Sequence, residues 1–441
     1  KNSKNGAGRP KMVDLFLIHF QIATVLFLYE LFIRVYTMVA RAISPWNAKA
    51  RMWTDGRVGL MDRLREELSK GTGPVVWMHC SSLGEFEQGR PVLERIRLQY
   101  PGHRILLTFF SPSGYEVRKG YDGADIVSYL PMDSRRHAQE FLDLADPSLA
   151  IFVKYEFWHH FLHGLKERGT PTLLVSGIFR PGQPFFRSYG GFWRNMLGCF
   201  SRIFLQDQAS LDLVRGIGLG DRSIVGGDTR FDRVVEIADK GSEVPGLSAF
   251  CGSHDVLVAG STWEEDEDVL VHFVNQRTGL RTIIAPHEPG PSEVADIRKK
   301  FKDTILYSEW RSGRSMEGAR VLILDGMGML ASAYRHATIA YVGGGFGEDG
   351  VHNVLEAAVH DKPVVIGPEF EKFREAVDLV DLGGAIVVES AVELEREMGS
   401  LLSNGMDRHG IGRIAGDYVR ERTGATDSVM RYIQENRLLT N

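Results

Sequence analysis

One stretch of the chain decides the fold: Tyr341-Val-Gly-Gly-Gly-Phe-Gly-Glu-Asp-Gly-Val-His-Asn-Val-Leu-Glu-Ala-Ala358. An apolar strand runs here into a glycine-rich turn that opens onto a helix, and such a turn offers unpaired backbone N–H groups and partial positive charge to an anion. Glycine lets a ligand approach the backbone closely. His352, Asn353 and Glu356 follow at helical spacing, so we expect them to share one face, where a carboxylate can accept hydrogen bonds from a ribose diol. The stretch predicts a nucleotide site.

Two other interpretations compete for this stretch. Residues 345–350 match the dinucleotide pattern G-x-G-x-x-G by letter, but Glu348 and Asp349 would bring two carboxylates to a pyrophosphate, which argues against NAD. The second alternative is a strand–helix turn that binds nothing and needs glycine only for its positive φ angles. The stretch taken alone leaves this second alternative open.

On both sides of this stretch, short apolar runs alternate with helix-period segments, which is typical of βαβ units and parallel sheets. We expect an α/β protein with two doubly wound Rossmann-like domains that face a cleft, and with ligands at the carboxyl ends of both sheets. A charged segment with Gly241, Pro245 and Gly246 predicts a linker between them. The expected strands cover 75–79, 105–109, 126–130, 149–153, 172–176 and 203–206, then 256–259, 282–285, 321–324, 339–342, 364–366 and 386–388.

Size and composition agree with this organisation. A chain of 441 residues suits two domains with an appendage. The net charge of −5 gives no reason to expect nucleic acid as a partner. The three cysteines are far apart and odd in number, which favours reduced thiols and a cytosolic location for most of the chain.

The N-terminal region is the exception. Residues 15–43 are mainly apolar, with a narrow polar stripe that includes Glu30, Arg34 and Arg41. This pattern predicts an amphipathic helix in the membrane surface, with Glu30 and Arg34 paired at i,i+4. A buried core helix is the alternative, because the stripe is narrow. A signal peptide is not expected, since no small-residue cleavage site follows. The basic residues 1–11 support no conclusion.

Four charged residues after strands of the first half are candidates for catalysis. Glu85 begins the first helix and would project from the carboxyl edge as a general base. Ser82 and Glu85 also fit a capping box, in which the Glu85 side chain only accepts a hydrogen bond from the backbone N–H of Ser82. Lys154 and Glu156 are expected on one side of the fourth strand end, as a pair near a reacting centre or as an ordinary ion pair. Arg230 is a further cation that could meet an acidic ligand.

No metal site is expected. His159 and His163 stand one helical turn apart, but no third ligand is recognisable near them. Residues 266–268 read Asp-Glu-Asp, as in enzymes that hold a metal on a sugar nucleotide. They fall in the first turn of a predicted helix, where solvated acids are ordinary.

Together these residues resemble the 3-deoxy-D-manno-octulosonic acid (Kdo) transferases of lipopolysaccharide synthesis, which are membrane-associated GT-B glycosyltransferases. The resemblance runs from about residue 15 to the C-terminal helix and depends on the order of many short motifs. These are Asn47-Ala-Lys-Ala50 with Gly56-Arg57, Ser82-Leu-Gly-Glu85, Glu156-Phe-Trp158, Gly260-Ser-Thr262, Met327-Gly328, His352-Asn-Val-Leu-Glu356, Gly367-Pro368 and Lys372-Phe373.

The resemblance implies roles for particular residues. Glu85 would be the catalytic base, and Lys154, Glu156 and Arg230 would belong to the catalytic set. The CMP part of the donor would be held by residues of three loops: Pro286, His287, Met327, Gly328, Met329, Asn353, Val354, Leu355 and Glu356. No metal and no other cofactor is expected.

The chain departs from the family pattern at four points. Lys154 stands where the family commonly has a glutamate, and Arg230 stands where it has a lysine. Trp263 replaces a histidine after Gly-Ser-Thr, and Pro-Arg-His of the family reads Pro286-His287-Glu288. These changes affect the electrostatics of the expected site, because an amine replaces a carboxylate and guanidinium geometry differs from that of ammonium.

The function implied is inverting transfer of Kdo from CMP-Kdo to a lipid A precursor, lipid IVA, at the cytoplasmic face of the inner membrane. The expected parts are a membrane helix over 12–45, an acceptor-binding domain over 46–235, a linker over 236–250, a nucleotide-sugar domain over 251–407 and C-terminal helices over 408–441 that could return to the first domain. A sugar-nucleotide epimerase and a noncatalytic membrane-attached nucleotide-binding module are the alternatives. The oligomeric state is left open.

Overall fold

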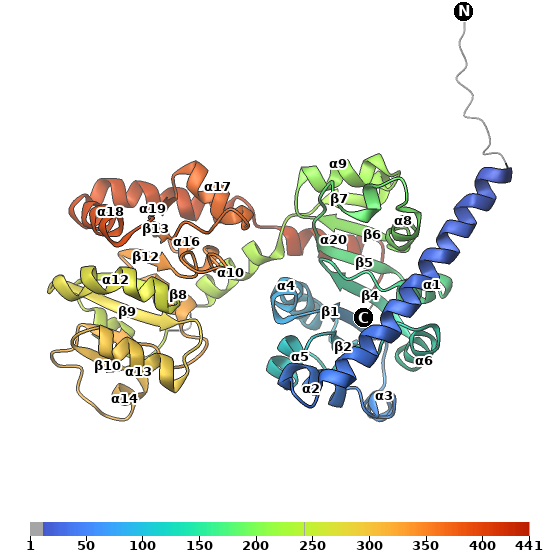
Figure 1. Cartoon of the computed structure of the whole chain (residues 1–441), viewed down its shortest axis with the longest axis horizontal. Coiled ribbons are helices and arrows are strands. Elements are labelled where there is room, and N and C mark those ends of the chain that lie inside the picture. The colour runs from blue at the N-terminus through green and yellow to red at the C-terminus, as the bar shows by residue number, and fades with distance from the viewer. Residues whose placement is uncertain (1–11, 242, 441) are drawn as a thin grey trace, which may run out of the picture. The chain divides into compact units, whose positions relative to one another are not determined.

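The computed structural model describes residues 12–241 and 243–440, with side chains from Ala23 onward, so the basic residues 1–11 lie outside the described chain. The chain divides into two compact units, which Figure 1 shows with their elements labelled. The first comprises Lys1–Arg230 and Gly424–Asn441, and the second Phe231–Thr423. Each unit contains one seven-stranded parallel sheet. The predicted α/β class, with two Rossmann-like units of the GT-B type, is confirmed.

The sheet of the first unit has the strand order β3-β2-β1-β4-β5-β6-β7. The chain adds strands on one side of β1 and then returns to add β4 on its other side. A ligand site of a doubly wound sheet is expected at this reversal, beyond the carboxyl ends of β1 and β4. The strands are β1 Val75–Cys80, β2 Arg104–Phe109, β3 Ile126–Tyr129, β4 Pro147–Val153, β5 Thr172–Gly177, β6 Arg202–Leu205 and β7 Ser223–Val225.

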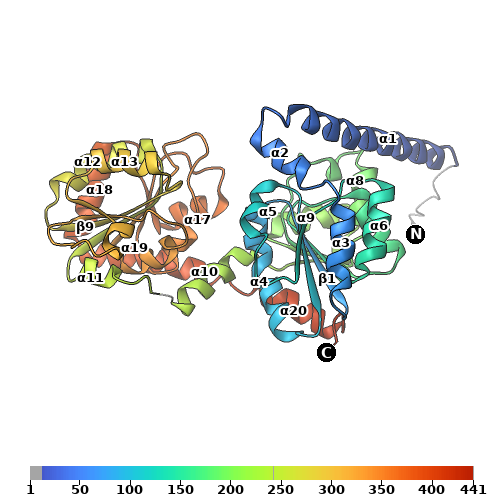
Figure 2. The same ribbon diagram turned by 90° about the horizontal axis from the view of Figure 1, so that it is seen from below.

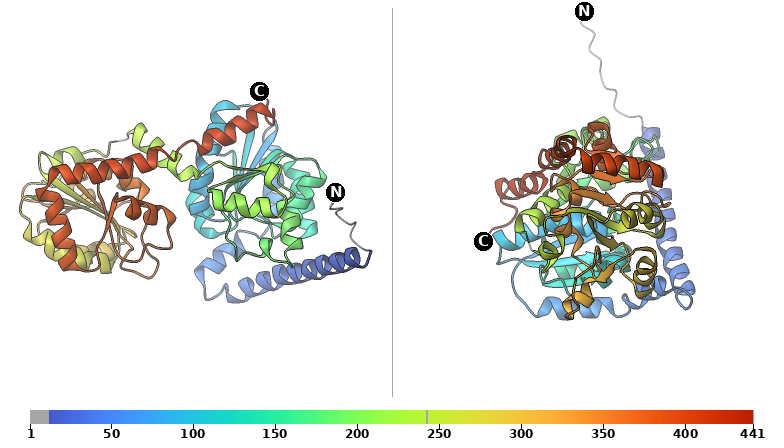
Figure 3. Two further views of the ribbon diagram at one scale, coloured as in Figure 1. Left: turned by 90° about the horizontal axis from the view of Figure 1, so that it is seen from above. Right: turned by 90° about the vertical axis from the view of Figure 1, so that its left-hand side faces the viewer.

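Helices cover both faces of this sheet, which explains why its strands read as continuous apolar runs. Alternate residues of β1 serve the two faces: Trp77 packs with residues of α6 and α7, and Met78 packs with residues of α4 and α20. The C-terminal helix α20 thus belongs to this unit, where Figure 3 shows it on the side opposite α1. The helices are α2 Ala48–Asp55, α3 Leu60–Ser69, α4 Leu83–Gln99, α5 Pro112–Arg118, α6 Arg135–Ala145, α7 His159–Glu167, α8 Gly191–Leu197, α9 Gln208–Gly216 and α20 Ala425–Glu435.

The N-terminal helix α1, Met12–Ile43, lies along the flank of the first unit beside α2 and α8 (Figure 2). Within the described residues it is the one helix long and apolar enough to cross a membrane, over Ala23–Ile43, by length and composition. One side of it is attached to the unit: Ile33 and Ala40 are buried against Trp53 and Met132. Most other side chains described for this helix are exposed or partly exposed, so the alternative of a buried core helix is wrong.

The polar stripe of α1 faces the protein. Glu30 pairs with His160 of α7 at 3.4 Å, and not with Arg34 as predicted. Arg34, Thr37 and Arg41 line a cavity of about 880 Å³ between α1 and the helices α2 and α3. Many large apolar side chains of α1 are exposed; these are Phe27, Leu28, Leu31, Phe32, Val35, Met38, Val39 and Ile43.

The sheet of the second unit has the order β10-β11-β9-β8-β12-β13-β14, and the chain reverses between β8 and β12. Its strands are β8 Asp255–Thr262, β9 Leu280–Pro286, β10 Thr304–Leu306, β11 Val321–Ile323, β12 Ile339–Val342, β13 Val364–Ile366 and β14 Ala385–Val387. Its helices are α10 Thr229–Lys240, which begins in the first unit, α11 Leu247–Cys251, α12 Glu264–Gln276, α13 Pro291–Lys300, α14 Tyr307–Arg311, α15 Leu330–Ala333, α16 Leu355–Ala358, α17 Arg374–Leu382, α18 Ala391–Ser403 and α19 Gly405–Arg420.

Three local features differ from the sequence-based expectation. The strands β7 and β10 were not predicted, because each has three residues and lies at the edge of its sheet. The helix after the glycine turn has one turn and begins only at Leu355. Most of the predicted linker over 236–250 is helical, and the division between the units falls between Arg230 and Phe231, within α10.

Candidate active site

Glu85 lies in the first turn of α4, directly after β1, at the strand reversal of the first sheet. Its Oε2 accepts a hydrogen bond of 2.5 Å from the backbone N–H of Ser81. The Ser82 side chain makes no capping bond, so the reciprocal capping box does not form. Burial raises the pKa of Glu85 to about 8, with help from the charge of Glu156, whereas the Ser81 bond and Lys154 act to lower it. A desolvated carboxylate of this kind can take up a proton near neutral pH.

Glu156 lies beyond the end of β4 and is only 6% exposed. Its Oε2 is 2.8 Å from His79 Nε2 and accepts a hydrogen bond of 2.6 Å from Trp158 Nε1. The predicted pair with Lys154 is not formed. Strand alternation does not hold here, since β4 ends at Val153 and Lys154 has a φ angle of +65°. The Lys154 ammonium lies 5.3 Å from the centre of the Tyr155 ring.

Sequence reasoning missed His79 and Thr108, which continue this network into the sheet. His79 Nδ1 lies 2.9 Å from Thr108 Oγ1, which accepts a hydrogen bond of 2.8 Å from Trp77 Nε1. All three are fully buried. No local motif reveals them, because their contact depends on the register that sets His79 opposite Thr108 between β1 and β2.

Arg230 is held in place by a second buried acid. Its guanidinium bonds to Asp228 Oδ2 at 2.8 and 2.9 Å, and Asp228 in turn accepts a hydrogen bond from Gln88 of α4. The charges of Arg230 and Glu85 both act on the Tyr155 phenol. Burial raises the pKa of Tyr155, Glu85 adds to the rise, and Arg180 and Arg230 oppose it, so all three charges lie within electrostatic reach of one phenol. The edge of the first sheet therefore brings Glu85, Lys154 and Arg230 together.

The predicted nucleotide residues of the second unit lie at or after the ends of parallel strands, at the carboxyl edge of one sheet. Pro286 ends β9 and His287 follows it, Met327 to Met329 follow β11, Asn353 and Val354 follow the glycine turn after β12, and Leu355 and Glu356 begin α16. Asn353 Nδ2 donates to Glu356 Oε1 at 3.0 Å. The side chains of Val354 and Leu355 are fully buried in the core, so they position this loop.

Three rings form a stack at this edge. The rings of His287 and His352 are nearly parallel, with their centres 4.1 Å apart, and the Trp263 ring stacks against His287 with the centres 4.8 Å apart. Trp263 Nε1 donates to His352 Nε2 at 2.8 Å. Burial lowers the pKa of His352 to about 4, and the neighbouring His287 adds to this, so His352 is neutral at pH 7 with an unprotonated Nε2. Trp263, a departure from the family pattern, is thus part of the edge.

The glycines of the turn make room mainly for the protein itself. A Cβ on Gly345 would lie 2.6 Å from the backbone nitrogen of Gly367, and one on Gly343 would lie 2.4 Å from the carbonyl oxygen of Ser261. At Gly347 the nearest atom would be 3.6 Å away, so this position is open. Neighbouring backbone is thus a sufficient reason for glycine at 343 and 345, and the expectation that these glycines also let a ligand approach stays a prediction.

Asp266 was predicted to be a solvated residue of a helix start, and this is wrong. It is fully buried and accepts hydrogen bonds from the backbone N–H of Gly344 at 2.8 Å, the N–H of Trp263 at 2.9 Å and the Tyr341 hydroxyl at 2.7 Å. These bonds connect the start of α12 to the glycine turn. The carboxylate thus fixes the two loops on either side of the strand reversal.

No group of three or more histidine, cysteine, aspartate or glutamate side chains in the described chain could hold a metal ion. His159 and His163 do lie together, with ring centres 4.3 Å apart. Burial lowers the pKa of His159 to about 3, and His163 contributes.

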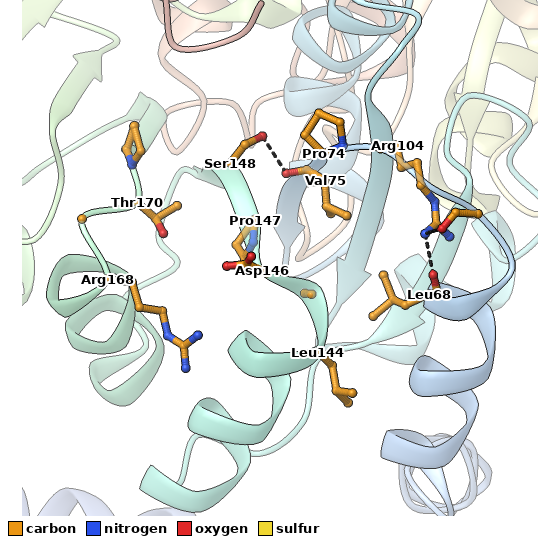
Figure 4. A pocket seen from close by; sticks show the side chains of 15 residues that line it. Leu68, Pro74, Val75, Arg104, Leu144, Asp146, Pro147, Ser148, Arg168 and Thr170 are labelled. Carbon is orange, nitrogen blue, oxygen red and sulfur yellow. Dashed lines mark hydrogen bonds between the residues drawn. The ribbon is translucent and has the colours of Figure 1, made fainter.

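A hollow of about 610 Å³ opens at the opposite edge of the first sheet, beside the amino ends of β1 and β4 (Figure 4). Its polar groups are engaged within the protein: Arg104 bonds to the carbonyl of Leu68, and Ser148 bonds to that of Val75. None of the predicted site residues lines it.

Comparison with known proteins finds relatives with one shared description. A family model described as 3-deoxy-D-manno-octulosonic-acid transferase matches residues 54–233. The 3-deoxy-D-manno-octulosonic acid transferase of Chlamydia trachomatis serovar A is 29% identical over 326 residues, which are 69% of this chain and 74% of that protein. The enzyme of the same description from Haemophilus influenzae is 26% identical over 381 residues, 82% of this chain and 88% of that protein.

Among solved structures, UDP-GlcNAc 2-epimerase from Neisseria meningitidis is similar in fold, with a TM-score of 0.58 at 13% identity, over 82% of this chain and all of that one. At this identity the likeness concerns the fold alone. The named relatives, by contrast, share sequence over most of the chain. The chain is therefore a glycosyltransferase that is similar, over most of its length, to the 3-deoxy-D-manno-octulosonic acid transferases of lipopolysaccharide biosynthesis.

Proposed function

We propose that this enzyme moves Kdo from CMP-Kdo to the glucosamine hydroxyl of a lipid A precursor, lipid IVA, with inversion at the anomeric carbon. The observation that carries the proposal is Glu85, a desolvated carboxylate at the strand reversal of the first sheet, with a pKa of about 8. A general base works best when its pKa lies near the working pH, because an adequate fraction of it is then unprotonated and it still binds a proton strongly.

In the proposed reaction, Glu85 takes the proton of the acceptor hydroxyl while that oxygen forms its bond to the anomeric carbon. The bond from this carbon to the phosphate oxygen breaks, and CMP leaves with the electron pair and the negative charge. Arg230, held by the buried Asp228, and Lys154 would offset the charges of the leaving phosphate and of the sugar carboxylate. Asp228 supports this role because it fixes the direction of the guanidinium.

The donor nucleotide is assigned to the carboxyl edge of the second sheet. The open position at Gly347, the Asn353–Glu356 pair and the stacked rings of His287 and His352 support this assignment. We further propose that no divalent metal takes part, because the donor carries a single phosphate and cationic side chains are available to it. Transfer should persist after exhaustive EDTA treatment, and loss that magnesium or manganese restores would contradict this part.

The acceptor and the membrane are assigned to the first unit. Supporting this, α1 is attached to the unit along one side, where Ile33 and Ala40 are buried, and it leaves many large apolar side chains exposed, which would be an aggregation liability in water. The enzyme would thus lie on the cytoplasmic face of the inner membrane, with Arg34 and Arg41 at the bilayer level near the phosphates of lipids.

Membrane attachment can be tested without deleting α1, whose buried side supports the fold. Changing the exposed Phe27 and Phe32 together to aspartate should weaken binding to vesicles of phosphatidylethanolamine and phosphatidylglycerol by about tenfold or more, since each ring no longer enters the apolar layer. Val117→Asp, at an exposed apolar residue of α5, is the matched control and should bind as before. Equal vesicle binding by all three proteins would contradict the surface assignment.

The purified full chain with CMP-Kdo and lipid IVA distinguishes the proposal from its rivals. Lipid-linked Kdo together with released CMP supports transfer. An altered nucleotide sugar without lipid product would favour an epimerase, and CMP binding without turnover would favour a noncatalytic module. Either of the last two results would overturn the proposal.

A further inference from the structure

The cavity between α1, α2 and α3 is large enough to hold a ligand. Its volume of about 880 Å³ is typical of small-molecule sites. The lining comes from these three helices, which Figure 2 labels, and from the segment after β3, which contributes Pro131 and Met132. Arg34 and Arg41 of α1 also line it and are exposed, so they lie at its mouth. The cavity thus combines enclosed space with cationic side chains at the entrance.

The two arginines of α1 are available to a ligand. Among the residues that the structure describes, neither Arg34 nor Arg41 has an ion-pair or hydrogen-bond partner. Thr37 lies between them on the same face of the helix, and its hydroxyl bonds back to the carbonyl of Ile33 at 2.8 Å. A guanidinium can donate two parallel hydrogen bonds to a phosphate, which makes arginine well suited to bind one.

A third arginine in the lining, Arg57, is partly buried and has no carboxylate partner in the described chain. Its hydrogen bonds, of 2.9 to 3.1 Å, go to the backbone carbonyls of Trp53, Phe110 and Leu130. Burial lowers the pKa of Arg57 to about 9, so the group is still a cation at pH 7. Because carbonyl oxygens carry no net charge, an anion in the adjacent cavity would offset the charge of Arg57.

Two carboxylates also line the cavity, and they do not cancel the arginines. Asp62 pairs with Arg65, which lies outside the lining, at 2.8 Å. Asp55 is exposed and has no ion-pair partner within the described residues. Three arginines therefore stand against one unbalanced aspartate. The charge of the lining favours an anionic group.

The rest of the lining is mainly apolar and continues onto the exposed side of α1. Met38 and Val58 line the cavity and are 59% and 70% exposed. Trp46, just beyond the end of α1, is 85% exposed, as tryptophans at a membrane interface often are. Cations beside an apolar surface of this kind fit a molecule that carries both a phosphate and an acyl chain.

We propose that this cavity binds one phospholipid of the bilayer, whose phosphate diester bonds to Arg34 and Arg41 and whose acyl chain leaves past Met38 along the exposed side of α1. The proposal rests on the proposed membrane attachment of α1, and it does not depend on the transfer reaction. It goes beyond attachment because it assigns a single lipid to a defined site.

The position of the cavity favours a phospholipid over the acceptor as occupant. No residue of β1 or β4, or of the segments that follow them, lines the cavity, although Glu85 lies there. The cavity lies instead beside β3, the edge strand, which β2 separates from β1. A lipid in the cavity therefore leaves the strand reversal free for the acceptor.

The first test measures binding of phosphatidylglycerol to the full chain in nonionic detergent, by native mass spectrometry. We expect a complex with one lipid per protein. Arg34→Gln combined with Arg41→Gln should weaken it by about tenfold or more. The matched control combines Arg135→Gln and Arg136→Gln, which removes the same charge from an exposed pair on α6 outside the lining. Equal loss in both double variants would mean general attraction and would overturn the proposal.

The second test fills the cavity without a change of charge. Thr37→Trp should place a ring in the space between Arg34 and Arg41 and lower the affinity for phosphatidylglycerol by about tenfold, whereas Thr37→Val should bind as the wild type does. Unchanged binding in the tryptophan variant would place the lipid outside the cavity and refute the proposal. Melting temperatures report whether each variant is folded, and the arginine variants decide the matter if Thr37→Trp is not.

The third test uses competitors to identify the occupant. A ternary complex of the protein with one phosphatidylglycerol and one lipid IVA supports the proposal. Displacement of phosphatidylglycerol by lipid IVA would make the cavity part of the acceptor site, and displacement by inorganic phosphate would make it a site for free anions. Either result would overturn the proposal.

These measurements need no turnover, so they separate the lipid site from the proposed function. If the enzyme transfers no Kdo, a lipid complex that depends on Arg34 and Arg41 still supports the site. If the wild type transfers Kdo and binds vesicles but retains no phosphatidylglycerol in detergent, the lipid site is refuted while transfer and membrane attachment stand.

Discussion

The carboxyl edges of the two sheets are built in opposite ways. In the first unit the edge is made of charged side chains, and the principal acid, Glu85, is half-buried and held by the backbone N–H of Ser81. In the second unit the edge is made of backbone, since the glycine turn packs against the protein and Asp266 fastens it with three hydrogen bonds. Substitutions should therefore abolish chemistry at the first edge and damage the fold at the second.

The largest expected effect is at Glu85. Glu85→Gln should lower kcat for transfer by roughly two to four orders of magnitude, the usual range for loss of a general base. The amide can still accept the Ser81 bond, so the variant should bind CMP normally. The exposed Glu66→Gln on α3 is the matched control and should leave kcat unchanged.

Stability gives the same variant a second readout. The folded state raises the pKa of Glu85 from 4.5 to about 8, so this group favours folding at low pH and opposes it as the pH rises through 8. Glu85→Gln should therefore melt at a higher temperature than the wild type at pH 9. If the variant has a lower melting temperature than the wild type at every pH and keeps its turnover, the role of Glu85 is only to cap the N-terminus of α4.

At the second edge, Gly345→Ala and Gly347→Ala should have contrasting effects. Alanine at 345 drives a methyl group into the backbone of Gly367, which should cost about 1–3 kcal/mol of the free energy of unfolding and weaken CMP binding with it. At Gly347 there is space, so stability should change by less than about 0.5 kcal/mol. Chemical denaturation and CMP titration measure both. Equal stability of the two variants would mean that the turn is not packed as described.

A smaller effect is expected at Lys154, where the chain departs from its family. Lys154→Glu restores the family residue but replaces a cation that lowers the pKa of Glu85 with a second anion near Glu156. The acidic limb of kcat/KM should move to higher pH, with a loss of about tenfold at pH 7 for one unit of displacement. Lys154→Gln should lie between the two. Higher activity in the glutamate variant at pH 7 would show that the family acid acts directly on the reaction.

Sequence reasoning recovered most of the fold because both sheets are parallel and covered on both faces. Runs such as Val75–Cys80 are apolar throughout and stand out between helical segments. The two missed strands, β7 and β10, lie at sheet edges, and Ile224 and Val225 of β7 are more than a third exposed. Such short segments have no burial pattern that could reveal them.

The candidate site was predictable where a residue follows a strand, as Glu85 and His287 do, because parallel strands deliver their following loops to one edge. His79, Asp228 and Asp266 were beyond reach for another reason. Their roles depend on contacts between segments that are far apart in sequence, such as Asp266 with Gly344. Asp266 also has the local pattern of a solvated helix start, so the sequence favoured the wrong environment.

The most direct test of the central claim is the pH dependence of kcat/KM for transfer from CMP-Kdo to lipid IVA, measured on the wild type and on Glu85→Gln. We predict that wild-type kcat/KM falls tenfold per pH unit below a pKa near 8, because only the ionised Glu85 accepts the acceptor's proton, and that this limb is absent from the residual activity of Glu85→Gln. An acidic limb that persists unchanged in Glu85→Gln would contradict the claim that Glu85 is the base.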